Sequence, residues 1–502
     1  MKHTYDIIII GAGIIGTATA KFLSEYHLDV LVVDAAADVA CGATKANSGI
    51  LHAGYDCVPG TLKAKLNIEG ISMYRTLVQQ LEIPHTWNGS LVIAPIQDTH
   101  METSPPQAVK NTHNQLHALY ERGLKNGVPD MALLSAEEAM QLEPNLNKHI
   151  SGALWAKTAG IISPYEAAIA FAENAAAHDV AFSLETFVSN ISYADACLHN
   201  ITGMTHHKSD LEKIYCIATS KGNFYTPMII NASGINSGNL NNMINETQET
   251  ILAQRGEYYL LDNTQKNLVT RTIFQCPTNL GKGVLVAPTV DHNVLLGPTA
   301  IWTDDAHNAS TTTEGLSEVL TKAAMTLKNT PIRDRITAFS GIRAKHKSED
   351  FIINEPQPGF INALGIDSPG LSSAPAIGKR LADMALAHFQ PKRKIHFQPY
   401  RAAIRRLHNL AFEEQSEIVA QNPAYGNIIC RCETVSEAEI IDAIHRNPGA
   451  YNLDALKRRT RAQGGRCQGG FCTTKLMEIL AREQNMCESD VTKNGQGTQL
   501  VT

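Results

Sequence analysis

Gly11-Ala12-Gly13-Ile14-Ile15-Gly16 is the stretch that decides the fold of this chain. It follows an apolar run, Tyr5 to Ile10, and leads into a segment that we predict to be helical, Thr17 to Tyr26. A second apolar run, Val30 to Val33, then ends at Asp34. Strand, glycine-rich turn, helix and strand in this order are typical of a Rossmann-type dinucleotide-binding fold, so we predict an α/β domain here.

Each glycine of this motif has a separate task. Gly11 permits the tight turn, Gly13 lets backbone N–H groups approach a pyrophosphate, and Gly16 lets the helix pack on the strand. The N-terminus of the predicted helix adds a positive dipole for the phosphates, and Ile14 of the motif is a further predicted contact. The carboxylate of Asp34, at the end of the second strand, can accept hydrogen bonds from ribose hydroxyls. These five residues are our predicted nucleotide contacts.

Length and composition indicate a globular protein of two or three domains. The chain has 502 residues and a formal net charge of −6, without a block of basic residues. We therefore expect no nucleic-acid partner and no direct attraction to an acidic membrane. The opening apolar run is too short to span a membrane and lacks the anatomy of a signal peptide. We expect a cytoplasmic protein without a transmembrane segment, peripheral to the inner membrane only through partners.

Four of the ten cysteines stand close together near the end of the chain. They are Cys430 and Cys432, and then Cys467 and Cys472 after a glycine-rich approach. Four thiolates satisfy either one [2Fe–2S] cluster or one tetrahedral zinc ion, and spacing alone does not separate the two. We predict these four residues as metal ligands.

Two later segments favour FAD over NAD as the nucleotide. Tyr225 to Gly234 and Phe360 to Leu371 each carry an apolar strand that runs into small residues. With them the chain resembles the D-amino-acid-oxidase-like flavoproteins, whose FAD domain is assembled from widely separated segments. The resemblance implies FAD contacts at Ala232, Gly234, Gly365, Ser368, Gly370 and Leu371.

The loop from Gly42 to Gly49, followed by His52, narrows this resemblance. It is similar to the loop beside the flavin ring in glycerol-3-phosphate dehydrogenases and L-2-hydroxyglutarate dehydrogenases, which oxidise secondary alcohols. The resemblance implies flavin contacts at Thr44, Ser48 and Gly49. A histidine with a pKa near neutrality suits removal of the hydroxyl proton, so His52 is our candidate base. The other interpretation is a histidine that only packs against FAD or hydrogen-bonds within the fold.

Segments between the FAD-binding pieces have strand patterns that predict a substrate-capping sheet. Arg255 enters one of these strands, and Arg343 stands where the chain returns to the FAD domain, at the family's anion-binding position by resemblance. A guanidinium group can hold a phosphate or carboxylate bidentately. We predict both arginines as substrate ligands, with ion pairs as the alternative. Tyr258 is predicted to orient the substrate, although an aromatic residue on a strand often belongs to the core.

The end of the chain resembles the ferredoxin-like [2Fe–2S] module related to bacterioferritin-associated ferredoxin, in the form fused to anaerobic glycerol-3-phosphate dehydrogenases. The Cys-x-Cys pair, the run Arg458-Arg459-Thr460-Arg461 and the Cys-x4-Cys pair carry this resemblance. It favours a cluster over zinc. We predict a capping-box start for the helix after the first cysteine pair, either Thr434 with Glu437 or Ser436 with Glu439.

Together these features predict an α/β protein with four parts. They are a Rossmann-type FAD domain of discontinuous segments (1–80, 150–250 and 335–390), an antiparallel-sheet substrate-capping domain (81–149 and 251–334), a linker (391–422) and a small, mostly helical [2Fe–2S] module (423–502).

The predicted function is FAD-dependent oxidation of sn-glycerol 3-phosphate to dihydroxyacetone phosphate, with electrons passing through the cluster to a partner protein or quinone. One alternative is L-2-hydroxyglutarate, or a related 2-hydroxy acid, as the small anionic substrate. Another is a non-catalytic electron-transfer or redox-sensing subunit. The sequence leaves the oligomeric state open.

Overall fold

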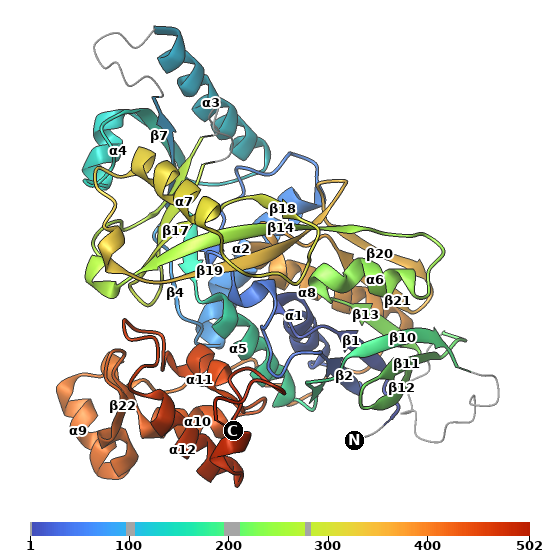
Figure 1. The fold of residues 1–502 in the computed structure, drawn as a ribbon. Coiled ribbons are helices and arrows are strands. Elements are labelled where there is room, and N and C mark those ends of the chain that lie inside the picture. The colour runs from blue at the N-terminus through green and yellow to red at the C-terminus, as the bar shows by residue number, and fades with distance from the viewer. Residues whose placement is uncertain (1–2, 97–105, 195–210, 277–282, 502) are drawn as a thin grey trace.

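The computed structural model describes residues 3–96, 106–194, 211–276 and 283–501, and its core is a mostly parallel sheet (Figure 1). Strand β1 (Ile7–Ile10) lies between β2 (Val30–Val33) and β13 (Met228–Asn231), and β21 (Phe360–Leu364) pairs with β13. These strands are buried along their whole length, as expected where a parallel sheet is covered on both faces. The full order is β20 (Ile352–Gln357), β21, β13, β1, β2 and β9 (Ala181–Ser183).

Alternate side chains of β1 face two different layers. Ile7 and Ile9 point into a core shared with helices, whereas Ile8 and Ile10 point into a core under an antiparallel sheet. The helical layer contains α1 (Ile14–Leu23), α2 (Leu62–Gln80), α5 (Pro164–Ala176) and α8 (Gly370–Phe389). The other layer contains β10 (Val188–Tyr193), β11 (Tyr215–Thr219), β12 (Gly222–Thr226) and α6 (Ser237–Asn242).

A second sheet, mainly antiparallel, forms the capping sheet (Figure 1). Its longest pair is β14 (Ile251–Leu261) with β19 (Arg335–His346). Apart from β19, the strands of this sheet follow in the order β18 (Ile301–Thr303), β14, β17 (Val294–Gly297), β16 (Leu285–Pro288), β15 (Thr272–Gln275), β5 (Ser90–Pro95), β7 (Ile150–Ala156) and β6 (Met131–Leu134). Helices α3 (Pro106–Lys125), α4 (Ala136–Leu142) and α7 (Thr313–Thr326) pack against it.

Two strands of the capping sheet fall within segments that we predicted as FAD-binding. Strand β7 pairs with β5 and β6, and β19 pairs with β14, so both belong to the capping sheet by their hydrogen bonds. We therefore propose boundaries after Ala156 and after His346. A small sheet of β3 (Ile50–Leu51), β8 (Gly160–Ile162) and β4 (His85–Thr86) lies where the two parts meet.

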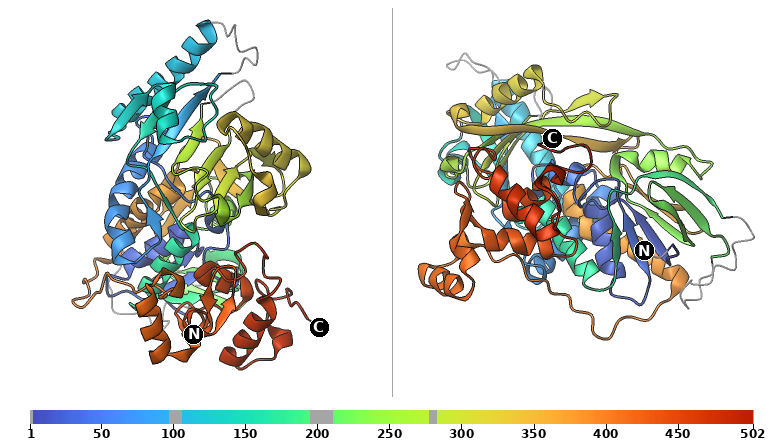
Figure 2. Two further views of the ribbon diagram at one scale, coloured as in Figure 1. Left: turned by 90° about the vertical axis from the view of Figure 1, so that its left-hand side faces the viewer. Right: turned by 60° about the horizontal axis from the view of Figure 1, so that its bottom comes forward.

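The predicted linker runs along the outside of the parallel-sheet domain before it reaches the C-terminal module (Figure 2). The Arg401 N–H group donates to the carbonyl of Gln80 at 3.0 Å, and the Arg401 side chain pairs with Glu173 at 2.5 Å. Its last part is a helix that we did not predict, α9 (Phe412–Gln421), in which the Glu414 carboxylate accepts the Ala411 N–H at 3.0 Å.

The C-terminal module has its own apolar core. It contains β22 (Ile428–Cys430), β23 (Val435–Ser436), α10 (Glu437–His445), α11 (Leu453–Thr460) and α12 (Thr473–Gln484). Of the two predicted capping boxes, the structure has the one that joins Ser436 and Glu439. No helix among the described residues is both long and apolar enough to cross a membrane.

A buried ion pair joins this module to the parallel-sheet domain. Asp38, in the loop after β2, accepts hydrogen bonds from Arg458 at 2.6 Å and from both terminal nitrogens of Arg459 at 2.8 and 2.9 Å. Burial opposes ionisation of Asp38, but the charges and hydrogen bonds of Arg459 and Arg458 outweigh it and lower the pKa of this carboxyl group. The contact therefore holds the module as a carboxylate–guanidinium pair at neutral pH.

We expect Asp38→Asn to lower the free energy of unfolding at pH 7 by about 3–5 kcal/mol, because it leaves two buried guanidinium groups short of a partner. Asp383→Asn removes one partner of an exposed pair with Lys379 and should cost no more than about 1 kcal/mol. Urea unfolding followed by circular dichroism measures both. Equal losses in the two variants would contradict this account.

Since the pKa of Asp38 is lowered in the folded state, its contribution is present above the pKa of the unfolded carboxyl group and is lost as the pH falls through the folded pKa. The difference in unfolding free energy between wild type and Asp38→Asn should therefore be full at pH 7 and shrink on acidification below about 3.9.

Candidate functional site

The predicted nucleotide turn lies at the carboxyl edge of the parallel sheet. Gly11 has φ of +111°, and a Cβ atom there would lie 2.4 Å from the carbonyl oxygen of Ala232, so only glycine fits where the ends of β1 and β13 meet. A Cβ atom on Gly16 would lie 1.8 Å from the Gly11 carbonyl oxygen, which gives this glycine its packing role. Helix α1 has Gly13 as N-cap, without a side-chain cap.

Asp34 organises the same turn from the end of β2. Its two carboxylate oxygens accept the N–H groups of Ala12 at 2.7 Å and Ala36 at 2.8 Å. Burial raises the pKa of Asp34, against the lowering effect of these two hydrogen bonds. The side chain is only partly buried, so it remains accessible at the edge where a ribose is predicted to bind.

A second helix N-terminus belongs to the same region. Helix α8 begins at Gly370 after Pro369, which provides no side-chain cap, and the buried Ser373 hydroxyl in its first turn has no hydrogen-bond partner among the described residues. Helices α1 and α8 pack closely, since a Cβ atom on Gly378 would lie 2.8 Å from Ala18. The start of α8, which has no side-chain cap, and its unpaired buried hydroxyl fit a cofactor rich in hydrogen-bond acceptors, such as FAD. No sequence motif singles out Ser373.

The other predicted FAD contacts lie in turns around these helices. Gly234 and Gly365 adopt positive φ angles of +60° and +67°, and no neighbouring atom would meet a Cβ atom on Gly234 within 4 Å. Gly365, Ser368, Gly370 and Leu371 form the approach to α8, and the Leu371 carbonyl accepts the Tyr74 hydroxyl at 3.1 Å. All of these roles in FAD binding remain predictions.

The loop from Gly42 to Gly49 connects this cofactor region to the capping sheet. Thr44 Oγ1 accepts the Ile14 N–H at 3.0 Å, which ties the loop to the start of α1. Gly49 has φ of +65°, and Ser48 beside it is partly buried. A Cβ atom on Gly341 would lie 2.0 Å from the Ala46 carbonyl oxygen, so β19 crosses the loop in close contact.

His52 follows β3 in a half-buried position, and both its N–H and its carbonyl are hydrogen-bonded. The His52 N–H donates to Ser372 Oγ at 2.7 Å, and the His52 carbonyl accepts from Asn67 Nδ2 at 2.9 Å. The ring packs against Phe274 with centroids 5.5 Å apart, and among the described residues none hydrogen-bonds to the imidazole. Burial lowers the pKa of His52, with Asp56 acting in the opposite direction. A neutral imidazole with a free nitrogen can accept a proton.

The two predicted anion-binding arginines lie on opposite faces of the capping sheet. Arg343 is directly opposite Gln254, whereas Arg255 is opposite Ile342, and neighbouring residues of a strand alternate between faces. Gly341, which touches the Ala46 loop, lies on the Arg343 face. The structure therefore brings Arg343, and not Arg255, towards the predicted flavin loop.

The hydrogen-bond partners of the two arginines also favour Arg343 as the substrate ligand. Arg343 is half-buried and donates to Gln254 Oε1 at 3.0 Å and to the Thr299 carbonyl at 3.2 Å, both uncharged. Arg255 is buried and pairs with the Glu257 carboxylate at 3.1 Å. Of these two arginines, Arg343 is the one whose partners are uncharged, so its guanidinium group can still pair with a substrate anion.

Tyr258 is buried in the capping sheet, where its ring stacks on Phe339 with centroids 4.8 Å apart. This packing matches the core role that we gave as the alternative, and orientation of a substrate stays a prediction. Two cations that the sequence did not single out stand near the approach to α8, because Lys63 and Lys345 contact Asp367 at 2.5 and 3.8 Å.

The four predicted ligand cysteines form two pairs. Cys430 hydrogen-bonds to Cys472, which lowers the pKa of Cys430, and Cys432 hydrogen-bonds to Cys467. Among the described residues, no three His, Cys, Asp or Glu side chains converge on one metal position. Two pairs suit a dinuclear centre, in which each iron takes two thiolates, better than a single tetrahedral ion.

Backbone N–H groups surround these sulfur atoms. Gln463 and Glu433 provide them to Cys430, and Gly469, Gly470 and Phe471 provide them to Cys467. Such donors stabilise thiolate charge, as the glycine-rich approach to Cys467 predicts. The residues present therefore fit a [2Fe–2S] cluster.

Comparison with known proteins supports both predicted cofactors. The FAD dependent oxidoreductase family matches residues 6–384, and the BFD-like [2Fe-2S] binding domain matches residues 428–482. A glycerol 3-phosphate dehydrogenase from Caloramator mitchellensis is 44% identical over 99% of this chain and 98% of its own length. A mitochondrial L-2-hydroxyglutarate dehydrogenase from Homo sapiens is 30% identical over 59% of this chain and 61% of its own length.

A solved structure has the same fold. The dithionite-reduced L-alpha-glycerophosphate oxidase from Mycoplasma pneumoniae with FAD bound superposes with a TM-score of 0.69 and 28% identity, over 80% of this chain and 98% of that chain. The predicted fold class and both predicted cofactors, FAD and a [2Fe–2S] cluster, are confirmed, and the zinc alternative is set aside. This chain belongs to the FAD dependent oxidoreductase family and carries a BFD-like [2Fe-2S] binding domain after its flavin-binding part.

Proposed function

We propose that this oxidoreductase converts sn-glycerol 3-phosphate to dihydroxyacetone phosphate and passes the electrons through its [2Fe–2S] cluster to an external acceptor, a partner protein or quinone. The observation that carries the proposal is the placement of Arg343 on the sheet face that meets the loop before His52. In this arrangement Arg343 can bind the anion of the substrate, and His52 can accept the proton of its hydroxyl group. The 44% identical relative, a glycerol 3-phosphate dehydrogenase, supports phosphate as that anion.

Arg343 and His52 have separate roles in the proposed reaction. FAD, when bound, supplies the acceptor for the hydride from the carbinol carbon. Arg343 holds the phosphate with its guanidinium fork, so that the secondary alcohol lies at a fixed place. An imidazole nitrogen of His52 takes the hydroxyl proton, since burial keeps this ring neutral.

Anaerobic visible spectroscopy of the purified holoprotein tests the proposal. We expect glycerol 3-phosphate to bleach the flavin bands within the enzyme's turnover time and L-2-hydroxyglutarate to leave them unchanged. Bleaching by L-2-hydroxyglutarate alone would replace the substrate with a 2-hydroxy acid. If neither compound bleaches the flavin, but a reduced partner protein does, the chain is an electron-transfer subunit.

Substitution of the two arginines should separate substrate binding from stability. Arg343→Gln removes the charge that pairs with the phosphate, a loss of about 2–5 kcal/mol, so KM for glycerol 3-phosphate should rise at least ~30-fold with FAD retained. Arg255→Gln leaves the buried Glu257 carboxylate without its cation and should lower Tm with KM unchanged. Steady-state kinetics and thermal unfolding measure the two effects. A higher KM in Arg255→Gln only would reverse the assignment.

The lowered pKa of His52 predicts the pH dependence of flavin reduction. Because this histidine stays neutral below its usual value of 6.5, kcat/KM should hold as the pH falls through 6.5 and decline only at lower pH. Substrate phosphate also titrates near about 6. His52→Gln separates the two, since the decline caused by His52 should vanish in this variant while the decline caused by the phosphate remains. Stopped-flow flavin reduction between about pH 5 and 8 provides the profile.

A further inference from the structure

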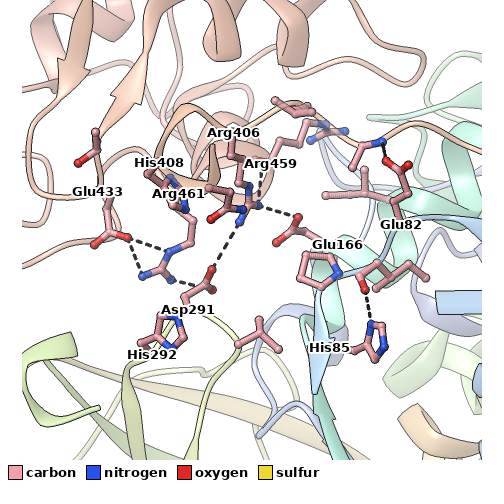
Figure 3. A pocket seen from close by; sticks show the side chains of 18 of the residues that line it. Glu82, His85, Glu166, Asp291, His292, Arg406, His408, Glu433, Arg459 and Arg461 are labelled. Carbon is pink, nitrogen blue, oxygen red and sulfur yellow. Dashed lines mark hydrogen bonds and ion pairs between the residues drawn. The ribbon is translucent and has the colours of Figure 1, made fainter. Parts of the chain in front are cut away.

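A cavity of about 520 Å³ lies where the cysteine module meets both the capping sheet and the parallel-sheet domain (Figure 3). Four guanidinium groups line it, and each already meets a carboxylate: Arg401 meets Glu173, Arg406 meets Glu166, Arg459 meets Asp38 and Arg461 meets Glu433. The cavity therefore has little attraction for an anionic ligand. Its charges serve the contact between the three parts of the chain.

A chain of alternating charges crosses this cavity (Figure 3). Arg461 contacts Glu433 at 3.1 Å and Asp291 at 3.3 Å, and Arg406 contacts Asp291 at 3.5 Å and Glu166 at 2.7 Å. These five side chains are 10–13% exposed. Each lies in a different segment: the loop after Cys432, the end of α11, the turn between β16 and β17, the linker, and α5.

Arg461, like Arg406, contacts all three parts of the molecule, and it does so from within the cysteine module. Besides Glu433 in its own module and Asp291 in the capping sheet, it donates to Asn293 Oδ1 at 2.8 Å, and it interacts electrostatically with Tyr165 at the start of α5. Its backbone has φ of +71° at the C-terminal end of α11, which turns the chain away from the helix. One guanidinium group thus restrains the module in more than one direction.

The contacts of Arg461 lead towards both predicted redox sites. Glu433 directly follows the cluster ligand Cys432. Tyr165 stands three residues after Ile162, whose N–H donates to the carbonyl of Gly49 at 2.8 Å in the predicted flavin loop. Arg461 therefore joins the neighbour of a cluster ligand to the element that supports the flavin loop.

We propose that Arg461 is a positioning residue that fixes the orientation of the [2Fe–2S] module relative to the flavin and so sets the rate of electron transfer between them. The inference rests on the proposed function for the direction of electron flow. In each transfer the reduced flavin loses one electron and the oxidised cluster gains one. The cluster must then give that electron to an external one-electron acceptor before it takes the second.

The test is anaerobic stopped-flow spectroscopy of the holoprotein mixed with glycerol 3-phosphate and ferricenium as one-electron acceptor. In Arg461→Gln, flavin bleaching should keep its wild-type rate, whereas cluster reduction should slow at least ~10-fold, since a displacement of about 1 Å can cost ~100-fold where geometry limits the rate. Iron content and the electron paramagnetic resonance signal after dithionite reduction should be unchanged.

The matched control is Arg466→Gln. Arg466 directly precedes the predicted cluster ligand Cys467 and, like Arg461, contacts the capping sheet, through Asp262 at 3.1 Å, but its side chain is 62% exposed. This control loses the same charge near the cluster and should transfer electrons at the wild-type rate. Equal slowing in both variants would overturn the proposal in favour of a charge effect on the cluster.

A second variant keeps the proposal testable if Arg461→Gln fails to hold its cluster. Asp291→Asn weakens the same contact from the capping sheet and leaves every residue of the module intact, so it should slow cluster reduction in the same way. Wild-type transfer in Asp291→Asn, or in a cluster-loaded Arg461→Gln, would overturn the proposal. If glycerol 3-phosphate fails to bleach the wild-type flavin, the proposed function fails, and photoreduction of the flavin still measures transfer in each variant.

Discussion

Strand β1 needs hydrogen-bonded partners on both of its edges, and the rest of the flavin-binding part follows from that requirement. Buried peptide groups must be paired, and β1 obtains its partners from β2, close in sequence, and from β13, more than two hundred residues away. Because the pairing is parallel, the carboxyl ends of β1, β2 and β13 meet at one edge. Gly11, Asp34 and Ala232 directly follow these strands, so the same hydrogen bonds that complete the sheet bring the predicted cofactor contacts together.

Local patterns made the cofactor regions predictable. The strand–turn–helix–strand order around Gly11 and the four cysteines are short-range signals, since a few neighbouring residues carry them. The capping box of Ser436 and Glu439 was one of two predicted options, and the structure decided between them. The two cysteine pairs could not be predicted, because which thiols meet depends on how two distant loops fold together.

Features that depend on long strands or on several segments were harder to predict. Strands β7 and β19 join the capping sheet although their neighbours in sequence belong to the other domain, and no composition change marks that crossing. The separation of Arg255 from Arg343 follows from strand register, which a single sequence does not supply. Arg461 lies in a basic run that we associated with the cluster module, and its contacts with Asp291 and Tyr165 need three segments placed together.

The interface of the cysteine module is built from charged pairs, whereas the module's apolar side chains pack into a core of their own. Buried ion pairs contribute little net stability after desolvation, but their geometry is specific. Covalent attachment explains how an interface of this kind can hold the module in place. The linker keeps the module beside its partner surface at an effective concentration of roughly millimolar, so even weak pairing keeps the surfaces together. A module held in this way behaves as one half of an intramolecular complex, whose tether allows an interface made largely of charged pairs.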